Sequence, residues 1–151
     1  MLELKVPPVL LTIIFAALMW LLADQASALP IPGTVRLAVL LLCMAAAILI
    51  GAGAVMSFRK AQTTVNPLTP ENCSALVDSG IFGFTRNPMY LALLLALMGW
   101  GIFLGAIYSL LLVAVYVAYL NRFQIRPEER ALEVAFGHEY QDYKKRVRRW
   151  I

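Results

Sequence analysis

The sequence predicts an all-α, polytopic membrane protein with about four transmembrane helices, two of them in a helical hairpin, and a C-terminal amphipathic helix. Hydrophobic residues make up 61% of the chain and charged residues 15%, whereas about 25% of the residues of soluble domains are charged. The hydrophobic residues gather in long runs without charge. A length of 151 residues fits a single integral membrane domain, with a two-span anchor (1–56) and a part that carries the expected chemistry (57–151).

The first two apolar runs each predict one membrane span. They cover residues 6–23 and 37–56, and a helix needs about 20 apolar residues to cross the hydrocarbon core. The first run also resembles a signal peptide, because "ASA" at 26–28 is a suitable cleavage site. We favour a retained span at this position.

The third apolar run covers residues 89–120, which is long for one span and short for two spans with a turn. Its central stretch, "MGWGIFLG" at 98–105, contains three glycines, which lower helix preference and permit a tight reversal. We expect two short or tilted helices joined as a hairpin. A single tilted helix, which would give three spans in total, is the alternative.

The distribution of cations favours the hairpin. With four spans, every Lys and Arg except Arg36 falls on one side of the membrane, since the others precede the first span, lie between the second and third, or come after the fourth. The positive-inside rule then places both termini and the 57–88 segment in the cytoplasm.

Two polar segments flank the predicted hairpin. In the segment 57–88, prolines exclude one continuous helix, and Thr69 followed by Pro70 predicts a short helix that begins there. In the tail, Pro127 is expected to start a helix with Glu128 and Glu129 in its first turn. Its apolar stripe, which we expect to be interrupted near Gly137, consists of Leu132, Phe136, Tyr140, Tyr143, Val147 and Trp150. The opposite, basic face predicts a helix on an anionic leaflet, with "KKRVRR" as a topology signal.

The hairpin would bring two polar groups to the same membrane face. They are Arg86, Asn87 and Tyr90 at the start of the third span, and Gln124, Glu128 and Glu129 after the fourth. Arginine, amides and paired carboxylates at the mouth of an apolar cleft suit a polar cofactor that meets a lipid-soluble substrate. The simpler interpretations are a snorkelling Arg86, an interfacial Tyr90 and helix-capping glutamates.

These residues resemble, in order and spacing, the isoprenylcysteine carboxyl methyltransferase family, which is related to the phospholipid N-methyltransferases. The matching stretches are "TTVNP" (63–67), "LVDSGIF" (76–82), "RNPMY" (86–90), "QIRPEERAL" (124–132) and "FGHEYQDY" (136–143). No single stretch is specific, whereas five in order are. Asn87 stands where the family usually has His, and Gln124 where it usually has Arg.

The resemblance implies an S-adenosylmethionine-dependent methyltransferase of the bacterial inner membrane. Its acceptor would be lipophilic, either a prenyl or fatty carboxylate or an amine headgroup. The resemblance assigns catalysis to Arg86, Asn87 and Glu129, and cofactor binding to these three together with Tyr90, Gln124 and Glu128. In this scheme the glutamates hold the cationic or hydroxyl parts of the cofactor, and Arg86 holds its carboxylate.

Two other classes of function compete with this one. A small channel would usually carry intramembrane charges, and residues 87–121 carry none. A non-enzymatic scaffold would depend on its basic tail rather than on the two glutamates. We expect neither a metal site, because His138 is the single histidine, nor a nucleic-acid partner, and the sequence leaves the oligomeric state open.

Overall fold

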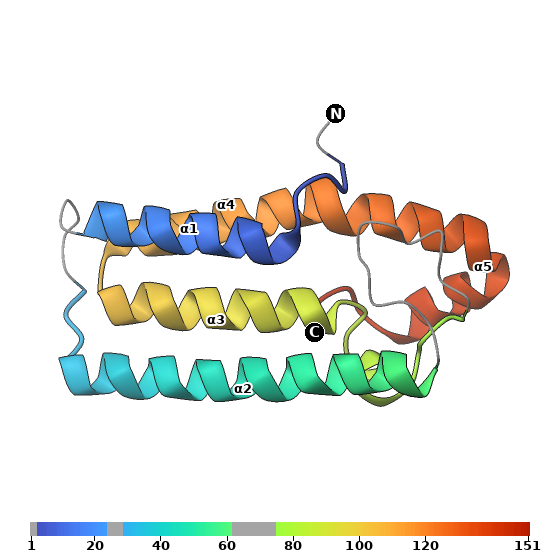
Figure 1. The fold of residues 1–151 in the computed structure, drawn as a ribbon, viewed down its shortest axis with the longest axis horizontal. Helices are drawn as coiled ribbons and strands as arrows, with labels where there is room; N and C mark the ends of the chain where they lie inside the picture. Colours follow the sequence, from blue (N-terminus) through green and yellow to red (C-terminus); the bar gives the residue numbers. More distant parts are fainter. Residues whose placement is uncertain (1–2, 24–28, 62–74) are drawn as a thin grey trace.

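The computed structural model describes residues 3–23, 29–61 and 75–151, which form helices and connections without a strand (Figure 1). This confirms the all-α class. An elongated bundle is formed by the helices α1 (Pro8–Leu22), α2 (Gly33–Lys60), α3 (Pro88–Leu104) and α4 (Ile107–Tyr119). The short helix expected from Thr69, the "TTVNP" stretch and residues 26–28 lie outside the described residues.

In the described part of the chain, two helices are long and apolar enough to cross a membrane. They are α2 and a helical segment from Ile107 to Arg146, in which α4 passes through a π-helical stretch, η4 (Leu120–Ile125), into α5 (Arg126–Arg146). The segment has 40 residues and is kinked at Gly137. Its part before the kink alone measures about 45 Å at 1.5 Å per residue, which is longer than the hydrocarbon core is thick. Its uncharged part, 107–121, is the candidate for the span. The helices α1 and α3 are apolar but shorter.

The third apolar run is a hairpin, as predicted. Helix α3 ends at Gly105, whose φ of 71° lies in the left-handed region that favours glycine. The Arg36 guanidinium lies against this turn and donates to the Leu104 carbonyl at 3.4 Å. A Cβ at position 105 would collide with that guanidinium. Arg36, which the sequence places alone among the cations on this side of the membrane, thus binds the turn of the hairpin.

The other two glycines of the run serve close packing. A Cβ on Gly99 would lie 2.7 Å from Cβ of Cys43 on α2, and one on Gly101 would lie 3.0 Å from Cβ of Ser109 on α4. Small residues let neighbouring helices of a membrane protein approach closely. The prediction of a reversal was correct, but only Gly105 makes it.

One core cluster fills the space between α1, α3 and α4. Its buried members are Leu11, Phe15, Met19, Tyr90, Leu97, Tyr116, Leu120 and Ile125. Within it the Tyr116 hydroxyl and Thr12 Oγ1 are hydrogen-bonded at 2.7 Å. The outward faces remain apolar, since Leu42 and Leu49 on α2 are 71% and 73% exposed. Exposed apolar surface of this extent suits contact with lipid.

Helix α5 begins at Arg126, with Pro127 in its first turn followed by Glu128 and Glu129, as the sequence predicted. The sequence did not predict that α5 follows α4 without a break. The π-helical turn just before Pro127 accommodates a residue that would otherwise interrupt the helix. The carbonyl that a proline at 127 leaves without its helical donor is that of Phe123. The Leu4 backbone N–H donates to this carbonyl at 3.0 Å, so the N-terminal segment compensates for the proline.

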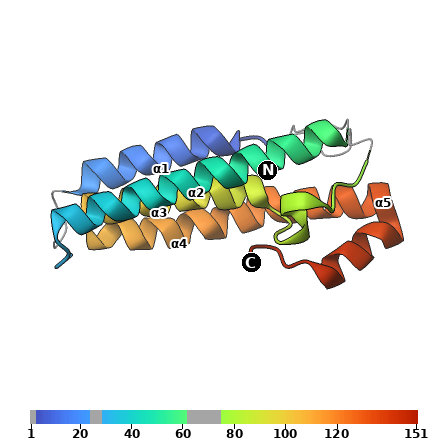
Figure 2. The same ribbon diagram turned by 90° about the horizontal axis from the view of Figure 1, so that it is seen from below.

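Helix α5 continues the line of α4 and then bends back toward the bundle (Figures 1 and 2). The bend falls at Gly137, with φ 50° and ψ −119°, which confirms the predicted interruption. Beyond the bend the apolar stripe turns inward and builds a second core cluster. Its buried members are Ala54, Val77, Phe82, Tyr140, Tyr143 and Val147.

Candidate active site

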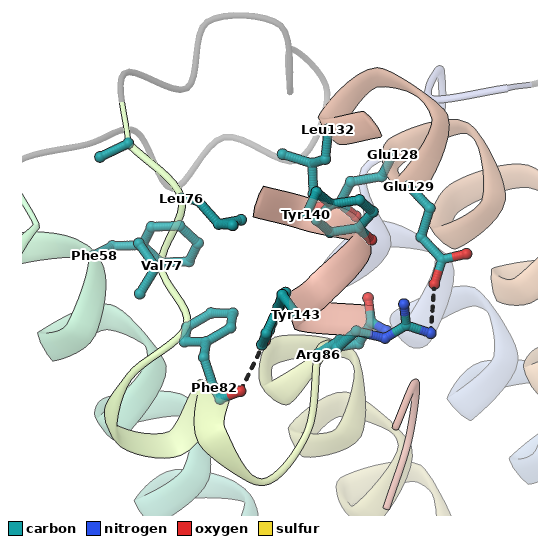
Figure 3. Close-up of a pocket in the computed structure, with 12 residues that line it drawn as sticks. Phe58, Leu76, Val77, Phe82, Arg86, Glu128, Glu129, Leu132, Tyr140 and Tyr143 are labelled. Atoms are coloured by element: carbon teal, nitrogen blue, oxygen red, sulfur yellow. Dashed lines mark hydrogen bonds and ion pairs between the residues drawn. The ribbon is translucent and has the colours of Figure 1, made fainter. Parts of the chain in front are cut away.

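A pocket lies at the end of the bundle where α5 folds back (Figure 3). Its walls come from the end of α2, the segment around the short helix η3 (Gly80–Gly83), the start of α3 and both halves of α5. The lining residues are Phe58, Ala75, Leu76, Val77, Phe82, Arg86, Asn87, Glu128, Glu129, Leu132, Tyr140 and Tyr143. The cavity measures about 50 Å³, enough for a few water molecules.

The two sequence motifs on either side of the hairpin meet in this pocket. Arg86 Nη2 lies 3.2 Å from Glu129 Oε1, and the two side chains are only 11% and 14% exposed. Figure 3 shows the contact as the link between the segment before α3 and the first half of α5. The hairpin therefore brings together residues 43 positions apart, as the sequence led us to expect.

Arg86 and Glu128 supply the groups that suit a zwitterionic ligand. Arg86 Nε and Nη1 are buried without a hydrogen-bond partner among the described residues, and unpaired buried donors are rare in folded proteins. A ligand carboxylate would satisfy them, and the Glu128 carboxylate could accept from a ligand ammonium or hydroxyl. Within the described ranges, no group of His, Cys, Asp and Glu is placed to hold a metal ion.

Asn87 lines the pocket but is largely committed to the C-terminal segment. Its side chain donates from Nδ2 to the Arg149 carbonyl at 2.8 Å, and its backbone N–H donates to Thr85 Oγ1 at 3.2 Å. Because Pro88 comes next, Asn87 is kept out of the helical conformation, with φ −130° and ψ 55° just before α3. These bonds fix the entry to α3 and leave the Asn87 amide oxygen for the pocket.

Glu128 and Tyr90 form a second polar pair. The Tyr90 hydroxyl donates to Glu128 Oε2 at 3.0 Å. Glu128 faces the pocket, whereas Tyr90 is buried behind it. Burial raises the pKa of the Glu128 carboxyl to about 7, against the lowering effect of the Tyr90 hydrogen bond and with a smaller contribution from Glu129. This carboxyl can therefore hold or release a proton near neutral pH.

Glu129 is bound by two arginines. Besides Arg86, Arg149 donates to it as a fork, from Nε to Oε1 at 3.0 Å and from Nη2 to Oε2 at 2.6 Å. Sequence reasoning did not find this role, since we interpreted the tail cations as a topology signal and nothing in the spacing separates Arg149 from Arg148. Glu129 is accordingly less available to a ligand than Glu128.

Gln124 lies apart from the pocket. It is fully buried in the π-helical stretch and donates from Nε2 to the Val6 carbonyl at 2.7 Å. It thus holds the segment that precedes α1, and its Oε1 has no partner in the part of the chain that the structure describes. Its predicted role in cofactor binding stays a prediction, whereas its contact with Val6 is structural.

The aromatic wall of the pocket was not predicted from the sequence. Phe58 and Phe82 pack edge to face with ring centres 5.1 Å apart, and the Tyr143 hydroxyl donates to the Phe82 carbonyl at 2.8 Å. Tyr140 closes the side next to Glu128 (Figure 3). We had interpreted both tyrosines as part of a helix stripe, and the stripe faces the pocket because the chain folds back at Gly137.

Long apolar helices with charged residues gathered at one end are typical of a helical membrane protein. The sequence model of the phospholipid methyltransferase family matches residues 35–139, and the chain belongs to this family of membrane methyltransferases. This confirms the resemblance found in the motifs. An uncharacterized protein from Haemophilus influenzae is 48% identical over 63 residues, which are 42% of this chain and 100% of that protein. No solved structure gives a significant match.

Proposed function

We propose that the protein is an integral membrane methyltransferase that uses S-adenosylmethionine to methylate a lipophilic acceptor at the cytoplasmic face of the membrane. The observation that carries this proposal is the contact between Arg86 and Glu129. In a member of a methyltransferase family, it joins the two motifs that the resemblance assigns to the site, at the end of an apolar bundle.

The pocket residues divide the work of cofactor binding. The unpaired donors of Arg86 bind the carboxylate of the cofactor, and Glu128 binds its ammonium or ribose. Asn87 hydrogen-bonds the adenosine part, Tyr90 orients Glu128, and Glu129 holds Arg86 in place. Gln124 supports the site indirectly, through its hydrogen bond to the Val6 carbonyl in the segment before α1. The cavity is smaller than a nucleoside, so binding requires movement of its walls.

The bound cofactor supplies an electrophilic methyl group on a sulfonium. The protein has to position the acceptor and exclude water, which the aromatic wall of Phe58, Phe82, Tyr140 and Tyr143 serves. For an amine headgroup, Glu128 accepts the proton that the amine must lose before it can attack. For a prenyl or fatty carboxylate no proton transfer is needed, so the acceptor determines whether Glu128 acts as a base.

We further propose four spans, α1 to α4, in a single membrane domain of the bacterial inner membrane. In this arrangement 1–56 is the anchor and 57–151 the catalytic part. Arg36 lies at one end of the bundle, and Arg86 and the tail cations at the other (Figure 1). The positive-inside rule then directs the pocket and both termini to the cytoplasm.

The test is calorimetric titration of the purified protein in detergent with S-adenosylmethionine. Arg86→Ala and Glu129→Ala should each weaken binding tenfold or more. Glu133→Ala is the matched control, because Glu133 lies one turn further along α5 and pairs with Lys144 nearer the surface. Undiminished binding in both site variants would remove the proposed site.

A further inference from the structure

The last residues of the chain run back across the entrance to α3. After Val147, which is extended (φ −123°, ψ 132°), the Arg86 backbone N–H donates to the Arg148 carbonyl at 3.0 Å. The Arg149 carbonyl accepts from Asn87 Nδ2 at 2.8 Å. We call residues 147–150 the C-terminal strap. Its backbone is held by Arg86 and Asn87, which belong to the stretch 86–90 before the hairpin.

The strap places the Arg149 side chain against Glu129, which belongs to the stretch 124–132 after the hairpin. Arg149 binds both oxygens of Glu129 in a fork, at 3.0 and 2.6 Å, and Arg86 Nη2 lies 3.2 Å from Oε1 of the same carboxylate. A planar, two-bond contact between arginine and carboxylate fixes orientation as well as distance. Glu129 has therefore no freedom to rotate away from Arg86.

The carboxylate of this cluster is more buried than the other carboxylates that pair with the end of the tail. The Glu129 side chain is 14% exposed, whereas those of Glu133 and Asp142 are 39% and 67% exposed. Exposed pairs contribute little, whereas losing one partner of a pair withdrawn from water leaves the other charge uncompensated. Arg149 therefore has a buried partner, which a cation that only sets topology would lack.

We propose that Arg149 is a positioning residue of the methyl-transfer site, which fixes Glu129 and, through it, the guanidinium of Arg86 at the pocket wall. The inference rests on the proposed function. Among the described residues, Arg86 has one side-chain partner, Glu129, and two unpaired N–H groups. If Arg149 were removed, Glu129 would keep a single contact, and Arg86 would lose its fixed orientation toward a ligand carboxylate.

The experiment uses the full-length protein in detergent and S-adenosylmethionine as the probe. Arg149→Gln should weaken binding about tenfold, and Arg149→Lys, which keeps the charge but not the fork, should fall between it and the wild type. Millimolar methylguanidinium should restore part of the affinity of Arg149→Gln, because the vacated position is partly open to solvent. Lys145→Gln removes an exposed tail charge and should bind like the wild type.

The outcomes separate this inference from the proposed function. If the wild type binds no S-adenosylmethionine, the proposed function fails and the inference fails with it. If the wild type binds and Arg149→Gln binds equally well or more tightly, only the inference is overturned. A weakened Arg149→Gln that methylguanidinium does not restore also overturns it, because the loss then does not depend on a guanidinium at this position. Should Arg149→Gln not fold, Arg149→Lys decides: wild-type affinity contradicts the proposal and a severalfold loss supports it.

Discussion

The two ends of the bundle are built on different principles. Around the Gly105 turn, the described helices α1, α3 and α4 are held by apolar packing, close contacts at glycines and a single cation, Arg36. At the other end, α5 and the C-terminal strap gather the ion pairs around Arg86 and Glu129. The first end explains how the helices hold together in lipid. The second explains why buried charges are retained next to a pocket.

The difference teaches that both ends contribute to stability, whereas the candidate site is confined to one of them. Packing between apolar helices tolerates the replacement of one apolar residue by another of similar volume. The charged end depends on individual atoms, because removing one partner of a buried ion pair leaves the other charge uncompensated. Substitutions at the Gly105 end should therefore change stability and leave cofactor binding intact. Substitutions at the Glu129 end should change both.

Glu129→Gln should have the largest effect. Two arginines would lose their shared carboxylate, which we expect to lower the free energy of unfolding by roughly 3 kcal/mol, at the low end for buried pairs because Arg149 is partly exposed. Thermal unfolding in detergent measures the stability, and a titration with S-adenosylmethionine should show at least tenfold weaker binding. Wild-type stability together with wild-type binding would contradict the account of this end.

Gly105→Ala should destabilise the protein by about 2 kcal/mol, since the left-handed conformation is unfavourable for alanine and the added Cβ would displace the Arg36 guanidinium. Gly137→Ala is the comparison at the other end. An added Cβ would meet open space there, but φ 50° with ψ −119° is a backbone conformation that residues other than glycine rarely adopt. The backbone alone should therefore cost about 2 kcal/mol. Thermal unfolding measures both variants, and wild-type stability of either would contradict the conformation assigned to its glycine.

The pH should change the affinity for the methyl donor through Glu128. Burial raises the pKa of this carboxyl to about 7, so the folded protein keeps its proton above the ordinary range and loses it as the pH rises. Folding stability from this group is present at low pH and declines toward pH 7. Binding of a cationic ligand favours the ionised form, so affinity should increase up to about tenfold between about pH 6 and pH 8.

Glu128→Gln tests the assignment of this titration. The variant cannot ionise at position 128, so its affinity should be weak and independent of pH over the same interval. Calorimetry in two buffers of different ionisation enthalpy would also detect the proton that the wild type releases on binding. A pH dependence that persists in the variant would assign the titration to another group.

Tyr116→Phe should have the smallest effect. It removes the hydrogen bond between the Tyr116 hydroxyl and Thr12 in the core of the bundle, and a bond of this kind is worth about 1 kcal/mol. The loss should show in thermal unfolding, with binding of S-adenosylmethionine within twofold of the wild type. Because Tyr116 lies in the last turn of α4, on the side of the pocket, a large loss of binding would mean that this hydrogen bond also supports the site.

The contacts that depend on the hairpin could be predicted from the sequence. Most contacts that depend on the bend of α5 at Gly137 could not. Arg86 and Glu129 could be placed together because one reversal near Gly105 connects them. The role of Arg149 could not be predicted, because it depends on the bend at Gly137 and on an extended segment that pairs with Asn87. Pro127 was correctly placed in the first turn of α5. Its continuity with α4 could not be predicted, because it depends on the N-terminal segment, which lies far away in sequence and whose Leu4 backbone N–H donates to the Phe123 carbonyl.

The central claim is that methyl transfer takes place in the pocket that Arg86 and Glu129 line. The most direct measurement incubates the purified protein with S-adenosylmethionine labelled in its methyl group and with a lipid extract of bacterial membranes, and then separates the labelled lipids. The account predicts a labelled lipophilic product with the wild type and at least a tenfold smaller yield with Arg86→Ala. No labelled product with the wild type, or an equal yield with the variant, would contradict it.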